Sequence, residues 1–221
     1  MHDWLATPPG AYLLAWEREQ VAAAVADVFG FHALQLGLPE LDALAANRMP
    51  HRWLASESPC DKADFVTHFS ALPFPANSLD LVVMPHSLEL TADPHAALRE
   101  VERVLVPEGR VVIFGLNPMS LWGLRQSRAH LYRRLGMECM FLPQAGKFIG
   151  YFRLRAWLHL LGFDVETVHF GCYRPAVVST SSLAQFAWMD TLGARCWPIL
   201  GAVYGLVAVK RVRGMTLPAL A

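Results

Sequence analysis

The chain has 221 residues, of which 54% are hydrophobic and 17% are charged, so it is long and apolar enough for one α/β domain and too apolar to be intrinsically disordered. Its 19 basic and 19 acidic residues balance, and no overall field favours a nucleic acid or an anionic membrane surface. The four cysteines include no Cys-x-x-Cys pair, which argues against a zinc knuckle or a redox pair, and we expect no metal site.

Neither the start of the chain nor its apolar runs indicate a membrane or secretion signal. Residues 1–4 are Met-His-Asp-Trp, without the basic and apolar segments of a secretory signal. The longest apolar run, residues 197–209, is shorter than the roughly twenty residues that a membrane-spanning helix needs. We therefore expect a cytoplasmic protein without a membrane partner.

The first part of the chain predicts a helix and two strands. Apolar residues recur at spacings of three and four over residues 11–29, which predicts an amphipathic helix that ends at Gly30. Residues 31–37 form an apolar strand pattern, followed by a short helical piece that reaches Ala46. A second strand is predicted at residues 52–55.

The central part of the chain has the clearest boundaries between predicted strands and helices. Residues 79–84 form a continuous apolar run, which is typical of a strand buried on both faces of a parallel sheet. Asp93 and Pro94 begin a helix that runs to about Val106, because Asp caps a free N–H and proline suits the first helical position. Residues 110–114 form the next strand. Together they predict a right-handed βαβ unit.

The last part predicts a helix at residues 153–161 and strands at residues 163–170 and 201–212. Residues 127–150 fit no compact strand pattern. We therefore expect residues 1–221 to form one domain with a lid or insertion around residues 127–150.

An ordered series in the central part resembles a known family. The series is Leu72-Pro73-Phe74, Ser78-Leu79-Asp80-Leu81-Val82, Asp93-Pro94, Ala97-Leu98-Arg99-Glu100 and Arg103-Val104-Leu105-Val106-Pro107-Glu108-Gly109-Arg110. It is similar to the central half of the class I, Rossmann-like methyltransferases that depend on S-adenosylmethionine. Residues 114–118 and 122–125 also resemble a branch of small bacterial methyltransferase-like proteins.

The resemblance implies the fold and the activity. The fold would be a doubly wound, mostly parallel seven-stranded α/β sheet with helices on both faces and an antiparallel C-terminal strand that inserts between its neighbours. We expect residues 79–84 and 110–114 to be the neighbours of a central strand at residues 33–36. The activity would be transfer of a methyl group from S-adenosylmethionine to an acceptor that the sequence does not identify.

The family pattern also implies a cofactor turn after the first strand. There the family has an acidic residue and two glycines, whereas this chain has Gln35, Gly37, Leu38 and Pro39. Gln35 lacks the charge that would neutralise the cofactor's ammonium group, and Pro39 restricts the turn. We therefore expect weak binding of S-adenosylmethionine. Gly37 as an ordinary turn glycine is an equal alternative.

The resemblance assigns four more residues to the cofactor. Glu57 lies near the position of the carboxylate that grips the ribose, and His68 stands where relatives have an Asp that meets the adenine. Phe69 and Pro85 belong to the same loops. For Glu57 a solvated surface position is the alternative, and for His68 a packing role.

Three residues are candidates for catalysis and substrate binding. His86 follows a central strand, at the edge where ligands bind in open α/β sheets, and is the candidate general base. Asn117 and Arg125 are candidate substrate contacts. The alternatives are backbone and packing contacts for the His86 loop, an Asx turn for Asn117 and a charge on a helix face for Arg125.

Two main functions remain open at this point, beside a third and weaker one, a different small-molecule or nucleotide site on the same sheet edge. The first is a methyltransferase that acts on a small-molecule or macromolecular acceptor. The second is a non-catalytic binding or regulatory protein that kept the fold and lost the cofactor, which the departures at Gln35 and Pro39 favour. No nucleic-acid partner is expected, and a homodimer is left open.

Overall fold

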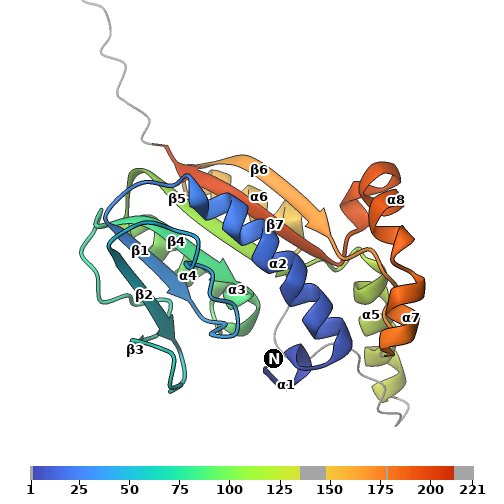
Figure 1. Ribbon diagram of the computed structural model, residues 1–221. Helices are drawn as coiled ribbons and strands as arrows, with labels where there is room; N and C mark the ends of the chain where they lie inside the picture. Colours follow the sequence, from blue (N-terminus) through green and yellow to red (C-terminus); the bar gives the residue numbers. More distant parts are fainter. Residues whose placement is uncertain (1, 135–147, 178, 212–221) are drawn as a thin grey trace, which may run out of the picture.

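The structure is a computed structural model that describes residues 2–134, 148–177 and 179–211 (Figure 1). Its centre is a seven-stranded sheet with the order β3-β2-β1-β4-β5-β7-β6. The strands are β1 His32–Leu36, β2 His51–Ser56, β3 Phe65–Val66, β4 Leu79–Pro85, β5 Leu105–Leu116, β6 Phe163–Gly171 and β7 Val203–Lys210.

The strand pairing confirms the predicted topology, with one correction. The strands from β3 to β5 pair in parallel, while β7 is antiparallel to both β5 and β6 and lies between them. The expectation that residues 110–114 neighbour the first strand is wrong, because β5 pairs with β4 and not with β1. The central strand is β4, whose burial on both faces agrees with its continuous apolar sequence.

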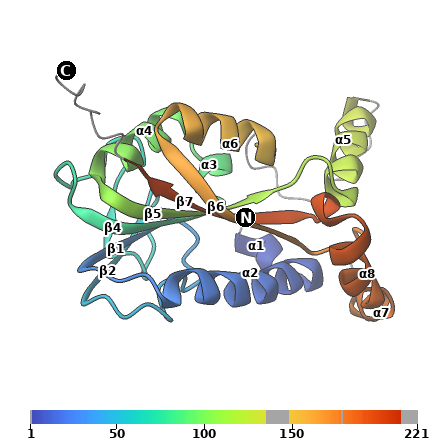
Figure 2. The same ribbon diagram turned by 90° about the horizontal axis from the view of Figure 1, so that it is seen from above.

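Helices cover both faces of the sheet (Figure 2). One face carries α1 His2–Leu5 and α2 Pro8–Ala26, and the other carries α4 Pro94–Val104 and α6 Tyr151–Leu160. The predicted cap of α4 is confirmed, since Ala96 N donates to Oδ1 of Asp93 at 3.0 Å and Pro94 takes the first helical position. Its buried residues are Ala97, Leu98, Val101 and Val104.

The helical piece predicted to reach Ala46 is wrong. Residues 38–47 form turns, with bonds such as that from Leu41 N to Leu38 O at 3.1 Å. Proline at position 39 and a positive φ of 47° at Leu38 are both unfavourable for a helix that starts here. The face of the sheet over β2 therefore lacks a helix from this connection.

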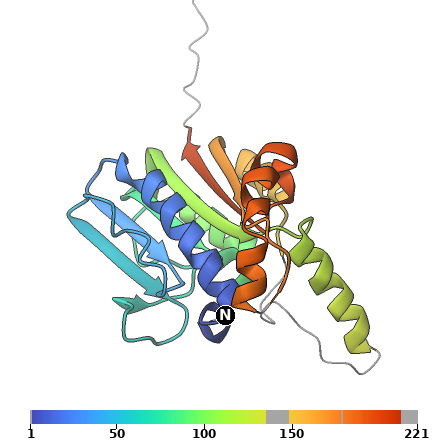
Figure 3. The same cartoon turned by 45° about the vertical axis from the view of Figure 1, so that its right-hand side comes forward.

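The remaining helices gather at one end of the sheet, away from β1, β2 and β3 (Figures 1 and 3). They are α5 Leu121–Arg134, α7 Thr180–Gln185 and α8 Trp188–Cys196, followed by the 3-10 helix η1 Pro198–Leu200. The short α3 Ser87–Leu90 follows β4. Residues 127–134 of the predicted insertion thus belong to the helix α5, and its residues 135–147 lie outside the described residues.

No helix among the described residues is long and apolar enough to cross a lipid bilayer.

Candidate functional site

The carboxyl ends of β1 and β4 form the edge at which the sequence predicts a ligand site. The chain order reverses between these two strands, since β2 and β3 lie beyond β1 while β5 lies beyond β4. Such a switch point is where open α/β sheets bind ligands. Gly37, with φ of 75°, ends β1, and His86, with φ of 54°, ends β4.

The side chain of Gln35 is hydrogen-bonded to the backbone of the turn after β1. Its amide nitrogen Nε2 donates to the backbone oxygens of Gly37 at 3.0 Å, Leu38 at 3.0 Å and Leu41 at 2.7 Å. Its oxygen Oε1 accepts from Ala43 N at 2.9 Å. The two N–H groups of Nε2 are shared among these three oxygens, and a carboxylate has no N–H to donate. The connection after β1 is a turn and not a helix, and glutamine suits it because its amide both donates to and accepts from the turn backbone.

Gly37 is packed against protein atoms. A Cβ atom at this position would lie 3.3 Å from Oγ of Ser87 and 3.5 Å from the ring of Phe69. The Phe69 side chain is buried at 3% exposure, and the Ser87 hydroxyl donates to Leu36 O. The ring of Phe69 thus occupies the space beside the turn that a ligand would have to approach.

Glu57 is tied to the same loop. Its Oε1 accepts from Phe69 N at 3.1 Å and from Oγ1 of Thr91 at 3.3 Å. The carboxylate therefore lies between the loop after β3 and the end of α3. His68 is exposed and Pro85 is buried.

His86 lies in a buried cluster of charges. Its Nε2 is 2.6 Å from Oε1 of Glu17, and its Nδ1 is 3.0 Å from Oε2 of Glu89. Glu89 also accepts from Leu116 N at 2.6 Å. Burial alone would lower the pKa of His86, but the two carboxylates outweigh it and raise the pKa to about 10. Burial raises the pKa of Glu89.

This environment does not suit the predicted general base. A histidine with a pKa near 10 carries its proton at neutral pH, and both ring nitrogens of His86 donate to glutamates. The side chain is 1% exposed. The cluster instead joins β4, α3 and α2. Sequence reasoning missed Glu17. It is followed by other polar residues in the predicted helix, and nothing in the sequence indicates that its side chain is buried.

Asn117 makes the Asx turn that was the alternative to substrate binding, since Met119 N donates to its Oδ1 at 3.1 Å. Its Nδ2 donates to the backbone oxygens of Ile199 at 2.7 Å and Gly201 at 2.9 Å, so it ties the end of β5 to the start of β7. Arg125 donates to the backbone oxygen of Ala176. Both residues contact the backbone of neighbouring segments.

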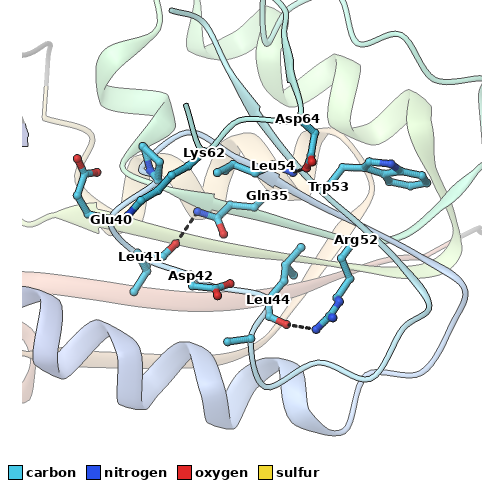
Figure 4. Close-up of a pocket in the computed structure, with 12 residues that line it drawn as sticks. Gln35, Glu40, Leu41, Asp42, Leu44, Arg52, Trp53, Leu54, Lys62 and Asp64 are labelled. Carbon is cyan, nitrogen blue, oxygen red and sulfur yellow. Dashed lines mark hydrogen bonds between the residues drawn. The ribbon is translucent and has the colours of Figure 1, made fainter. Parts of the chain in front are cut away.

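A hollow of about 460 Å³ lies on the α2 side of β2, where no helix follows β1 (Figure 4). Charged side chains of both signs surround it, and Gln35 and Pro39 lie at its wall. The lining residues are Gln35, Pro39, Glu40, Leu41, Asp42, Leu44, Ala45, Arg52, Trp53, Leu54, Lys62 and Asp64. The hollow therefore takes in only two of the predicted cofactor residues, and its walls do not include Gly37 or the loop of Phe69.

A second hollow, of about 300 Å³, lies at the carboxyl end of β5 beside the start of α6. It is lined by Asn117, Pro118, Met119, Phe148, Gly150, Tyr151, Phe152, Arg153, Phe170 and Ile199. Sequence reasoning placed only Asn117 near a ligand here.

The structure thus divides the predicted site residues. Gly37, Phe69 and Glu57 lie together at the edge of β1 and β4, with Pro85 and His86 at the end of β4. Asn117 and Arg125 lie beyond β5 and in α5.

Comparisons with known proteins agree with the fold. The pattern of a methyltransferase domain family matches residues 39–113. The match starts after Gln35 and Gly37 and extends from β2 into β5. An S-adenosylmethionine-dependent methyltransferase from Thermotoga maritima has a similar structure, with a TM-score of 0.64, 15% identity and coverage of 95% of this chain and 94% of that chain. At this identity the likeness concerns the fold.

Two curated relatives align over part of their length. The protein YafS of Escherichia coli, itself uncharacterized, is 37% identical over 94 residues, which are 42% of this chain and 36% of that protein. The biotin biosynthesis bifunctional protein BioHC of Saccharophagus degradans is 30% identical over 165 residues, which are 70% of this chain and 28% of that protein. The chain thus spans about a third of the length of these relatives.

Proposed function

We propose that the chain belongs to the class I, Rossmann-like family of S-adenosylmethionine-dependent methyltransferases, that it binds S-adenosylmethionine at the edge of β1 and β4, and that it transfers the methyl group to an acceptor. The observation that carries the proposal is the turn at Gly37. It follows β1 with a positive φ of 75°, at the point where the strand order reverses.

The residues at this edge fit the cofactor's groups in kind. The backbone of the Gly37 turn would meet the methionine part, the carboxylate of Glu57 would accept from the ribose hydroxyls, and His68 would accept from the adenine amino group. Gln35 would not neutralise the ammonium group, because its amide is uncharged and both its nitrogen and its oxygen are hydrogen-bonded to the backbone of the turn.

Phe69 is the residue that has to move. Its ring lies against Gly37, so the cofactor reaches the turn only when the side chain rotates away. This rotation adds a conformational cost, which lowers the affinity as the fraction of open molecules falls.

When bound, S-adenosylmethionine supplies an electrophilic methyl group, and no covalent residue of the protein is needed. The chain's own contribution is orientation. The cluster of Glu17, His86 and Glu89 holds the end of β4 rigidly against α2 and α3. Because His86 stays protonated, the proposal applies to acceptors whose nucleophilic atom does not need this histidine as a base.

Calorimetric titration with S-adenosylmethionine and S-adenosylhomocysteine tests the proposal. We expect both to bind to the parent chain and Gly37→Ala to weaken both. Gly162→Ala is the matched control, since Gly162 has a similar φ of 83° but follows α6 at the opposite edge. Equal affinities in the two variants would move the site elsewhere. No heat at millimolar cofactor, in the parent or in Phe69→Ala, would leave the non-catalytic binding protein as the function.

The cytoplasmic location, the homodimer and the division into one domain with an insertion stay predictions from the sequence.

A further inference from the structure

The hollow beside β5 has a chemical character of its own. Four of the ten residues that line it are aromatic and come from α6, from β6 and from the chain before α6, namely Phe148, Tyr151, Phe152 and Phe170. Two of the rings are fixed by packing, because Tyr151 meets Phe170 edge to face at a centroid distance of 5.6 Å. A flat ring in the hollow would therefore find aromatic surfaces that are already in place.

The floor beneath these rings is rigid. Tyr204 on β7 lies under Tyr151 and Phe170, with centroid distances of 6.3 Å to each. Its hydroxyl donates to Ile149 O at 2.7 Å, which fixes the chain just before α6. The hollow is thus preorganised, and binding would not require this wall to be ordered first.

The positive charge at the hollow favours a ligand with an acidic group. Among the described residues that line it, Arg153 is the only one that carries a charge. Its guanidinium carbon lies 5.9 Å from the ring centroid of Trp157, and the side chain is exposed at the rim. An anionic group on the ligand would gain from this cation, and an ammonium group would be repelled.

The hollow also opens on an apolar surface. Met119 and Phe152 are each 55% exposed and Ile199 is 44% exposed, although all three are large apolar side chains. Exposed apolar side chains that converge on a concave wall are typical of a site for an apolar ligand.

Its position suits an acceptor. It lies at the carboxyl end of β5, and β5 is separated from β1 only by β4. Two strand spacings place the ends of β1 and β5 about 10 Å apart. A ligand in the hollow could thus extend toward a group held at the Gly37 turn along the same edge.

We propose that this hollow is the acceptor subsite, and that the acceptor is a flat aromatic molecule with an acidic substituent. The role as acceptor subsite rests on the proposed function. The capacity to bind an aromatic acid rests on the hollow alone.

Two fluorescent probes test the binding chemistry. 1-Anilinonaphthalene-8-sulfonate is an aromatic acid, and N-phenyl-1-naphthylamine has the same rings without the acid group. We expect one site per chain for each. Phe152→Ser should weaken both probes about tenfold, because it removes an apolar wall. Arg153→Gln should weaken the sulfonate about threefold and leave the neutral probe unchanged.

Two control variants lie on the same helix. Leu160 is 82% exposed and Arg155 is exposed, and neither lines the hollow. Leu160→Ser and Arg155→Gln should therefore bind both probes like the parent. Near-UV circular dichroism shows whether each variant keeps its packing, and Met119→Ser replaces Phe152→Ser if that variant does not. Equal effects of the hollow variants and the controls, or none from either, would overturn the proposal.

Displacement of the sulfonate probe then tests the acidic group, with indole-3-acetate as the acid and tryptamine as the amine on the same ring. We expect only the acid to displace it. Displacement by both alike would overturn the assignment of an acid. If the acid displaces the probe while calorimetry detects no S-adenosylmethionine, the aromatic-acid site stands, and the acceptor role falls together with the proposed function.

Discussion

Nε2 of His86 lies 2.6 Å from Oε1 of Glu17, and this contact joins the end of β4 to the middle of α2 with both side chains buried. Because Glu89 contacts the other ring nitrogen, one histidine is shared by two glutamates. Replacing one partner of such a buried pair is costly, because the remaining charge stays desolvated and loses its partner.

Glu17→Gln tests the energetic weight of this contact. The amide keeps the shape of the side chain but loses the charge, so we expect the free energy of unfolding to fall by about 1.5–3 kcal/mol. Urea denaturation measures the change. Glu19→Gln is the control, because Glu19 lies on the same helix and is exposed. Similar losses in both variants would show that the contact with His86 contributes nothing specific.

The same cluster predicts a dependence of stability on pH. The pKa of His86 is raised from 6.5 to about 10 on folding, so the folded state holds this proton more tightly than the unfolded chain. The stabilisation is complete below pH 6.5 and is lost as the pH rises through about 10. The raised pKa of Glu89 has the same sign.

Urea denaturation at a series of pH values between about 7 and 9.5 should therefore give a falling free energy of unfolding. His86→Asn removes the titrating group and keeps a residue that tolerates the left-handed backbone, so its profile should be flatter. A parent profile that is level over this range, or an unchanged slope in His86→Asn, would contradict the raised pKa.

Gln35→Glu tests the role of the amide in the turn after β1. The carboxylate would lose the hydrogen bonds that Nε2 donates and would face the backbone oxygens of Gly37, Leu38 and Leu41. We expect the free energy of unfolding to fall by about 1–3 kcal/mol, and the deficit to shrink at low pH as the new carboxyl group protonates.

Thermal denaturation of Gln35→Glu beside Gln20→Glu measures this difference, since Gln20 lies on the surface of α2. A Gln35→Glu variant as stable as the parent would contradict the role of the Gln35 amide in this turn.

Phe69→Ala tests whether this ring limits access to Gly37. Its removal opens the space beside the turn, so S-adenosylmethionine should bind more tightly than to the parent. The truncation costs about 3–5 kcal/mol of stability, and calorimetry is therefore done at low temperature. Phe74→Ala, in the same loop but packed against Trp53 and Phe65, should not change the affinity. Weaker binding in Phe69→Ala would mean that the ring contacts the cofactor.

Local patterns along the chain determine much of the fold. The continuous apolar run of β4, the cap at Asp93 and the helix that follows are properties of neighbouring residues, and the structure confirms them. The turn glycine at position 37 belongs to the same class. Such features depend on spacing along the chain, which the amino-acid sequence states directly.

Tertiary structure decides what the site residues do. Glu17 and His86 are 69 residues apart, and nothing along the chain indicates that one neutralises the other. In the sequence, Gln35 differs from the family pattern because it lacks a charge. In the structure the connection after β1 is a turn, and the Gln35 amide donates to its backbone oxygens. The aromatic hollow needs side chains from β6, α6 and the end of β5 at once. Burial and contacts between distant segments determine whether a side chain is charged and which groups it contacts. Both conditions arise only when distant segments pack together.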